Sequence, residues 1–181
     1  MNRFAGVDGI AETGSASSRL VVRELSPAGI RTPEGFIVTV AAYQEFTRST
    51  SLRPFIAGQL RRYRQGADLL AVGAAIRTAF AYAEMPAALA RAVTAAYQEL
   101  GGDGTPVVVR SGVANFVDRR EVFLNVRTSR DVLGACKRCF AVLFTQRAIQ
   151  LRELHGIDQL AATMFVKVQR MGRSIPPPPA Q

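Results

Sequence analysis

The chain contains short apolar runs whose composition is typical of strands. Val107 to Val109 is an unbroken β-branched run, which predicts a strand buried on both faces, and Val122 to Val126 is short enough to be the returning strand. Phe36 to Val40 and Ala161 to Met171 predict two further strands. The sequence therefore predicts a small sheet.

Between these runs, apolar residues recur every three to four positions, as on one face of a helix. The spacing predicts a helix from Ala41 to Thr47 and a helical stretch from Leu52 to Leu100 with two breaks. A long helix is expected from Ser129, its N-cap, to about Leu154, and a loop-to-helix entry from Gly14 to Leu25. Together these elements predict an α+β fold, a small mixed sheet covered by helices.

The composition is that of one globular domain. Hydrophobic residues make up 48% of the 181 positions and charged residues 20%, which is enough for a sizeable core. The most apolar stretch, Leu69 to Ala83, is shorter than a membrane span of about 20 residues and contains Arg77. Asp8 and Glu12 fall where a signal peptide would be apolar, so we expect a cytoplasmic protein with no membrane partner.

The net charge of +9 comes almost entirely from arginine. Clustered arginines attract polyanions, and the dense group Arg61, Arg62 and Arg64 leaves nucleic-acid binding open as an alternative. The interpretation that we adopt is a solvated arginine surface, with a few guanidinium groups directed at nucleotide phosphates. The charge indicates association with anions and does not indicate a particular fold.

One arginine stands at a place suited to phosphate. Arg110 and Ser111 come directly after the Val107–Val109 run, where a buried strand would emerge from the core. A guanidinium at the end of a rigid strand can donate paired hydrogen bonds to phosphate oxygens. The two strands with Arg110 at their open end are therefore the candidate site.

Ordered sequence blocks carry a family resemblance. They are Ala28 to Thr39 with its Pro-x-Gly-Phe segment, Val107 to Ser111, Val122 to Val126, Lys137 to Ile149, and Val166 to Met171. In this order they are similar to the ATP-binding domain of the phosphoenolpyruvate synthase, pyruvate phosphate dikinase and rifampin phosphotransferase family. The resemblance spans about Gly14 to Arg173, between an N-terminal lead at 1–13 and a Pro-rich tail at 174–181.

This resemblance implies ATP as the ligand and the first half of an ATP-grasp-type nucleotide-binding domain. Arg110 matches the family arginine that follows the valine-rich strand and contacts phosphate. Gln169 matches the family residue at the hinge beside the adenine, and it equally suits a polar strand position that faces solvent. A nucleotide is therefore the partner that we expect.

The chain departs from the family pattern in the segments that would hold phosphate. Ser18 stands where the family has a phosphate-binding lysine, and the neighbouring Arg19 is a partial substitute. The family loop after the strand arginine is longer and rich in small residues that fold over the phosphates. Here only Gly112 keeps the backbone freedom that such a cover requires. Ser18, Arg19 and Gly112 join Arg110 and Gln169 as candidate nucleotide contacts.

Family members continue past the last block into a second half that supplies acidic magnesium ligands and another catalytic arginine. We therefore assign no catalytic residue and no metal ligand, and expect Mg²⁺ only if a separate chain supplies the missing half. The expectation is a truncated, catalytically incomplete ATP-binding domain of a phosphoenolpyruvate synthase-like phosphotransferase, from a kinase family. The alternative is a non-catalytic remnant or partner-binding module that no longer binds ATP.

Cys136 and Cys139 form a C-x-x-C pattern, which occurs in redox and zinc sites. Two thiols cannot build a four-cysteine zinc site, and both lie inside the predicted helix and not at its start. Cys136 also falls on the apolar stripe, so we interpret the pair as structural. His155, the only histidine, is expected at an exposed helix end.

Overall fold

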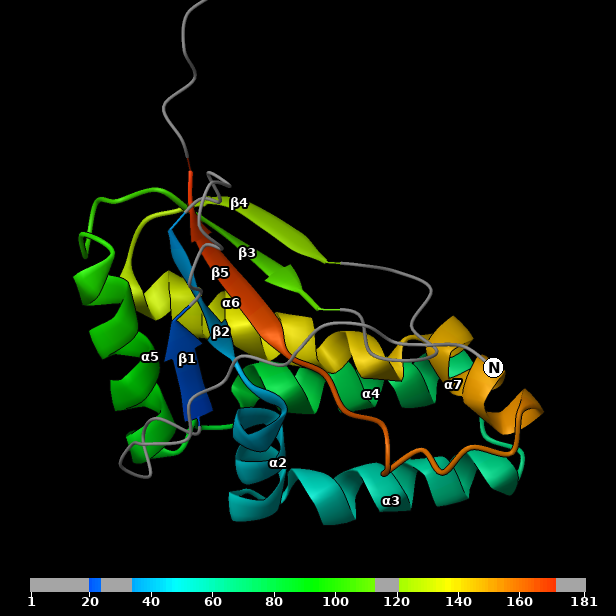
Figure 1. Cartoon of the computed structure of the whole chain (residues 1–181). Helices are drawn as coiled ribbons and strands as arrows, with labels where there is room; N and C mark the ends of the chain where they lie inside the picture. The colour runs from blue at the N-terminus through cyan, green and yellow to red at the C-terminus, as the bar shows by residue number, and fades with distance from the viewer. Residues whose placement is uncertain (1–19, 24–33, 113–120, 172–181) are drawn as a thin grey trace, which may run out of the picture.

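The computed structural model describes residues 20–23, 34–112 and 121–171, which form an α+β fold. Its centre is a five-stranded sheet in the order β1-β2-β5-β3-β4 (Figure 1). The strands are β1 (Val21–Arg23), β2 (Gly35–Val38), β3 (Val107–Ser111), β4 (Val122–Val126) and β5 (Val166–Arg170). The two strands predicted at Val107 and at Val122 are confirmed.

All the pairings between neighbouring strands are antiparallel. The predicted α+β class is confirmed, whereas the sheet is antiparallel and not mixed. The reason is the position of β5. The helices that follow β2 bring the chain back so that β2 and β3 run in the same direction, but β5 lies between them and opposes both.

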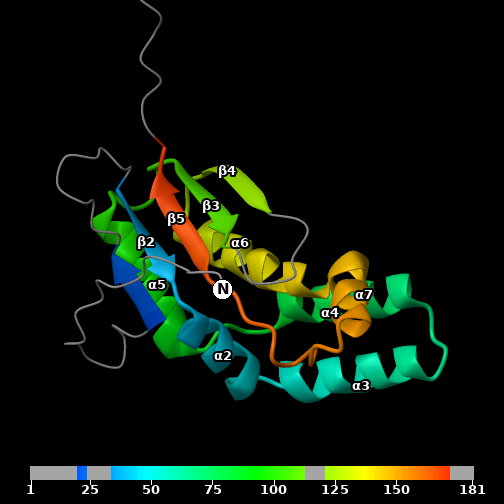
Figure 2. The same ribbon diagram turned by 45° about the vertical axis from the view of Figure 1, so that its right-hand side comes forward.

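Helices cover one face of the sheet and extend beyond it (Figures 1 and 2). They are α2 (Val40–Ser49), α3 (Leu52–Arg64), α4 (Leu69–Tyr82), α5 (Ala87–Glu99), α6 (Ser129–Ala141), the 3-10 turn η1 (Val142–Phe144) and α7 (Gln146–Leu154). α6 packs against β3, β4 and β5, while α3 packs along α4. The predicted helical stretch 52–100 is confirmed, with its two breaks. No helix in the described parts of the chain is long and apolar enough to cross a bilayer.

The single helix predicted over 129–154 is wrong in two respects. Thr128 is the N-cap in place of Ser129, because its hydroxyl accepts a hydrogen bond from a first-turn N–H at 3.1 Å. The helix also stops at η1, and Thr145 caps the separate helix α7. All three residues of η1 are buried, so the apolar pattern continues unbroken through this corner.

Two boundaries also differ from prediction. The helix entry predicted over 14–25 contains strand β1, which pairs with β2 as an antiparallel edge strand. The β-branched pair Val21–Val22 favours this conformation. The last strand begins at Val166 and not at Ala161, because residues 161–165 have no ladder partner among the described residues.

The two faces of the sheet differ in what covers them. The side chains directed at the helices are buried: Phe36, Val38, Val107, Val109, Val166 and Val168. The opposite face, called the second face below, carries Ile37, Val108, Arg110, Lys167 and Gln169. Val108 is only half-buried, so the prediction that the valine run is buried on both faces is wrong. Arg110, Lys167 and Gln169 are thus gathered on one side.

Candidate functional site

Arg110 and Gln169 lie together on the second face because β3 and β5 are neighbours. The register places Arg110 opposite Lys167, and Gln169 lies two residues further along β5 on the same face. Long side chains can meet across such a diagonal. Arg110 Nη2 donates a hydrogen bond of 2.7 Å to Gln169 Oε1. Arg110 is exposed and Gln169 is 9% exposed, so a largely buried amide holds a guanidinium that faces solvent.

Lys167 adds a second cation, which is not among the residues predicted from the sequence. It is the register partner of Arg110, and both side chains belong to the second face. The register therefore brings two basic side chains next to each other on adjacent strands. The signal for Lys167 is its spacing of two residues from Gln169 on one strand. The two cations make this part of the second face electropositive.

Close packing between β2 and β5 explains why the Pro-x-Gly-Phe segment has glycine at position 35. Gly35 pairs with Gln169 across β2 and β5. A Cβ atom at this position would lie 2.4 Å from the Val168 carbonyl oxygen and 2.9 Å from Gln169 Cγ. Only glycine therefore permits the approach of β2 that holds β5, and with it Gln169, in place.

Gly112 has a packing role in this structure. Its N–H donates a hydrogen bond of 2.7 Å to the Phe165 carbonyl oxygen, and a Cβ atom here would lie 2.3 Å from the Phe165 ring. This amide N–H is therefore engaged within the protein, and a contact of Gly112 with phosphate stays a prediction. Next to it, the N–H and hydroxyl of Ser111 both bond to the backbone of Glu121, at 3.0 Å each. These bonds join the two ends of the 113–120 interval.

Several predicted contacts lie outside the described residues. Ser18, Arg19 and the loop 113–120 belong to these segments, so their proposed roles toward phosphate stay predictions. Of the five candidate contacts, the structure brings Arg110 and Gln169 together and places Gly112 two residues beyond Arg110 at the end of β3.

The cysteines do not form a chemical site. Cys136 and Cys139 lie within α6 and are fully buried. Burial raises the pKa of the Cys136 thiol to about 12 and raises the pKa of Cys139 as well, so both remain protonated at neutral pH. The structural interpretation of this pair agrees with their burial. His155 is the exposed C-cap of α7.

The described residues form no cluster of protein ligands that could hold a metal ion by itself. Nowhere among them do three His, Cys, Asp or Glu side chains gather closely enough to hold a metal ion. Mg²⁺ prefers several oxygen ligands, usually one or two carboxylates together with phosphate and water. No chemical step is therefore assigned to a metal ion bound by these residues alone.

Comparison with known proteins establishes the family. Residues 11–175 match the family described as pyruvate phosphate dikinase, AMP/ATP-binding domain. The chain belongs to this family. It is 32% identical over 179 residues to a probable phosphoenolpyruvate synthase of Methanothermobacter thermautotrophicus and 34% identical over 182 residues to the phosphoenolpyruvate synthase of Aquifex aeolicus. It is 31% identical over 173 residues to a rifampicin phosphotransferase of a Streptomyces species.

These alignments cover most of this chain and a small part of each relative. They include 92%, 91% and 90% of the chain, but 26%, 21% and 20% of the respective relatives. The resemblance predicted from the ordered sequence blocks is confirmed. The chain is homologous to the N-terminal ATP-binding domain of these phosphotransferases, and Gly35, Arg110 and Gln169 all fall within the matched region.

Proposed function

We propose that this chain binds ATP on the second face of its sheet, with the phosphates at Arg110 and the adenine beside β5. The observation that carries the proposal is the 2.7 Å hydrogen bond between Arg110 and Gln169, in a region homologous to an AMP/ATP-binding domain. Two residues 59 positions apart in sequence thereby meet diagonally across adjacent strands. Their chemistry suits a phosphate and a base, respectively.

Electrostatics supports the phosphate end of this arrangement. Arg110 is exposed, and Lys167 is its partner across the strands. A triphosphate placed beside Arg110 would accept charge-assisted hydrogen bonds from its guanidinium. Gln169 fixes one arm of that guanidinium in advance, so less side-chain entropy is lost when the nucleotide binds. Ser18 and Arg19 are further proposed contacts.

For the complete reaction, only the reaction class is proposed. The relatives are phosphoenolpyruvate synthases and a rifampicin phosphotransferase. We propose that this chain acts as the ATP-binding part of such an ATP-dependent phosphotransferase, with magnesium ligands and further catalytic groups supplied from elsewhere. Phosphoryl transfer depends on positioning and on neutralising the charge of the phosphates, so binding by this chain alone would not produce turnover.

Isothermal titration of Mg-ATP into the purified chain tests the proposal. We expect micromolar binding that Arg110→Ala weakens more than tenfold, or about 1.4 kcal/mol. Arg91→Ala, which removes an exposed arginine of α5, is the matched control and should bind like the wild type. Absence of heat at millimolar ATP would contradict the proposal and favour a module that has lost ATP binding.

A further inference from the structure

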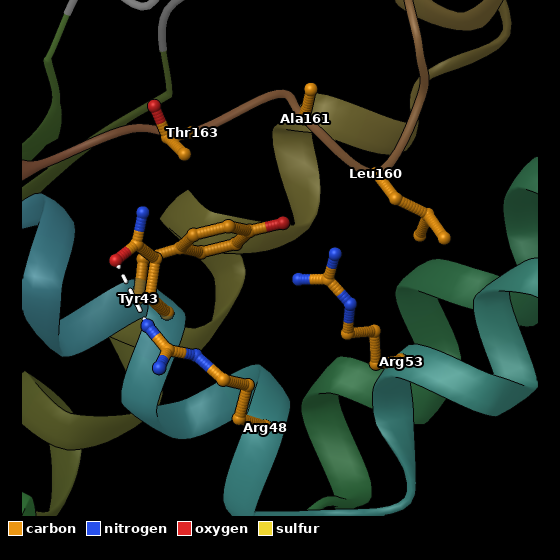
Figure 3. A pocket seen from close by; sticks show the side chains of 7 residues that line it. Tyr43, Arg48, Arg53, Leu160, Ala161 and Thr163 are labelled. Atoms are coloured by element: carbon orange, nitrogen blue, oxygen red, sulfur yellow. Dashed lines mark hydrogen bonds between the residues drawn. The ribbon is translucent and has the colours of Figure 1, made fainter.

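A pocket lies away from the second face, where α2, the start of α3 and the segment before β5 meet (Figure 3). Its volume is about 380 Å³. The polar part of its wall comes from Tyr43, Gln44, Arg48, Arg53 and Thr163. None of the described residues that line it is acidic. The pocket is thus polar and positively charged.

Tyr43 forms the buried end of the pocket. Its side chain is 5% exposed, and its ring packs on Phe80 and Phe140 with ring centroids 6.4 and 5.4 Å away. No described residue forms a hydrogen bond with its hydroxyl. Figure 3 shows this hydroxyl and the Arg53 guanidinium directed into the same space. A hydroxyl that opens into a pocket can donate a hydrogen bond to a bound polar ligand.

Three arginines from different helices lie at or behind the pocket. Arg53 of α3 forms no hydrogen bond or ion pair with a described residue. Arg48 of α2 donates a hydrogen bond of 3.0 Å to Gln44 Oε1, which orients its guanidinium along the pocket wall. Arg152 of α7 is fully buried behind them. Its Nη1 is the buried side-chain nitrogen that has no hydrogen-bond partner within the described regions.

The ionisation of these groups supports a positive site. Burial raises the pKa of the Tyr43 hydroxyl, and Arg152 and Arg53 partly oppose this rise. Tyr43 therefore remains a neutral donor at physiological pH. Burial lowers the pKa of Arg152 to about 10, so it remains a cation at neutral pH. Arg48 and Arg53 thus line the pocket, and Arg53 and the buried Arg152 both act on the Tyr43 hydroxyl at its end.

We propose that this pocket binds a small phosphate-bearing anion, either inorganic phosphate or a phosphomonoester. Arg53 and the hydroxyl of Tyr43 come from different elements and are directed into the same space, with Arg48 on the pocket wall, which suits an anion with several acceptor oxygens. The volume exceeds what one phosphate group needs and leaves room for a short organic substituent. Arg110 and Gln169 do not line this pocket, so the proposal is independent of ATP binding on the second face.

The test is a calorimetric titration of the full chain at constant ionic strength, because salt screens weak attraction to an exposed arginine. Inorganic phosphate and glycerol 3-phosphate are the probes, and acetate is the carboxylate comparison. The variants are Arg53→Gln and Tyr43→Phe, which retains the ring. Arg61→Gln, on the exposed side of the same helix, is the matched control. Arg110→Ala separates this pocket from the second face, and thermal unfolding establishes that each variant is folded.

We expect saturable binding of at least one phosphate probe in the wild type. Tighter binding of inorganic phosphate or of glycerol 3-phosphate shows whether the free anion or a phosphomonoester is the ligand. Arg53→Gln should weaken it about tenfold and Tyr43→Phe about threefold, because each removes a donor to the anion. Arg61→Gln and Arg110→Ala should leave it unchanged. The proposal is overturned by absence of saturation, by equal effects of Arg53→Gln and Arg61→Gln, by loss of binding in Arg110→Ala alone, or by acetate binding as tightly.

Discussion

The two faces of the sheet are made by the same strands but by different kinds of residue. On the covered face, Val107, Val109, Val166 and Val168 are all 0% exposed beneath the helices. The residues next to these valines along each strand point to the second face, and they include Arg110, Lys167 and Gln169. Because side chains alternate across a strand, alternate residues of β3 and β5 contribute to stability and to the proposed ligand site. Each set should therefore be separable by mutation.

Two arginines show the same contrast. Arg152, on the helical side, is fully buried and donates to the Gln159 amide oxygen at 2.7 Å and to the Leu143 carbonyl oxygen. Its guanidinium also lies over the Phe144 ring. Arg110, on the second face, is exposed and bonds to one side-chain amide. The buried arginine completes the fold, and the exposed one is available to a ligand.

The largest expected effect separates these two arginines. Arg152→Ala should lower the free energy of unfolding by about 4 kcal/mol, because it leaves two buried acceptors unpaired and opens a cavity. Arg110→Ala should change it by less than about 0.5 kcal/mol. Urea unfolding followed by circular dichroism measures both. Similar losses in the two variants would contradict the division between the sides.

Adjacent valines of β3 give a smaller and more local comparison. Val109→Ala should cost about 2.5 kcal/mol, since its methyl groups are fully enclosed by the helical layer. Val108→Ala, one residue away on the second face, should cost less than about 1 kcal/mol because this side chain is half-buried. The same unfolding measurement applies. A larger loss for Val108→Ala would mean that the second face is packed as a core.

The cysteines on the covered side predict a pH dependence. Their pKa values are raised by burial above the ordinary value of 9.0, so the unfolded chain releases these protons first. The unfolded state then binds fewer protons than the native state, and stability falls as pH rises above about 9. Between about pH 7 and pH 9.5 we expect a loss of about 1.5 kcal/mol. In the double variant Cys136→Ala, Cys139→Ala this loss should be much smaller; an equal loss would assign it to other groups.

The sequence predicts much of this fold because several signals are local. The valine run of β3, the short apolar run of β4, the apolar stripes of α3 to α5 and the Pro-x-Gly-Phe segment each depend on a few neighbouring residues. The corner at Val142–Phe144 is different, since all three residues are buried and the helical stripe passes through them without a sign of the turn. The three-residue strand β1 is too short to have its own periodicity.

The candidate site is predictable in part for the same reason. Arg110 and Gln169 were recoverable from their blocks, but the hydrogen bond between them depends on β5 lying next to β3, which no local pattern contains. Lys167 likewise becomes notable only through its register with Arg110. The pocket at Tyr43 joins three distant segments, and the burial of Arg152 contradicts the usual exposure of arginine.

Backbone NMR during a titration with Mg-ATP tests most directly whether the nucleotide lies on the second face. The amide signals of Arg110, Lys167 and Gln169 should shift in a saturable manner. Those of α3 and α4 should move little, because these helices pack mainly on other helices and away from the second face. Shifts confined to the pocket at Arg48 and Arg53, or the absence of any saturable shift at millimolar ATP, would contradict the proposed site.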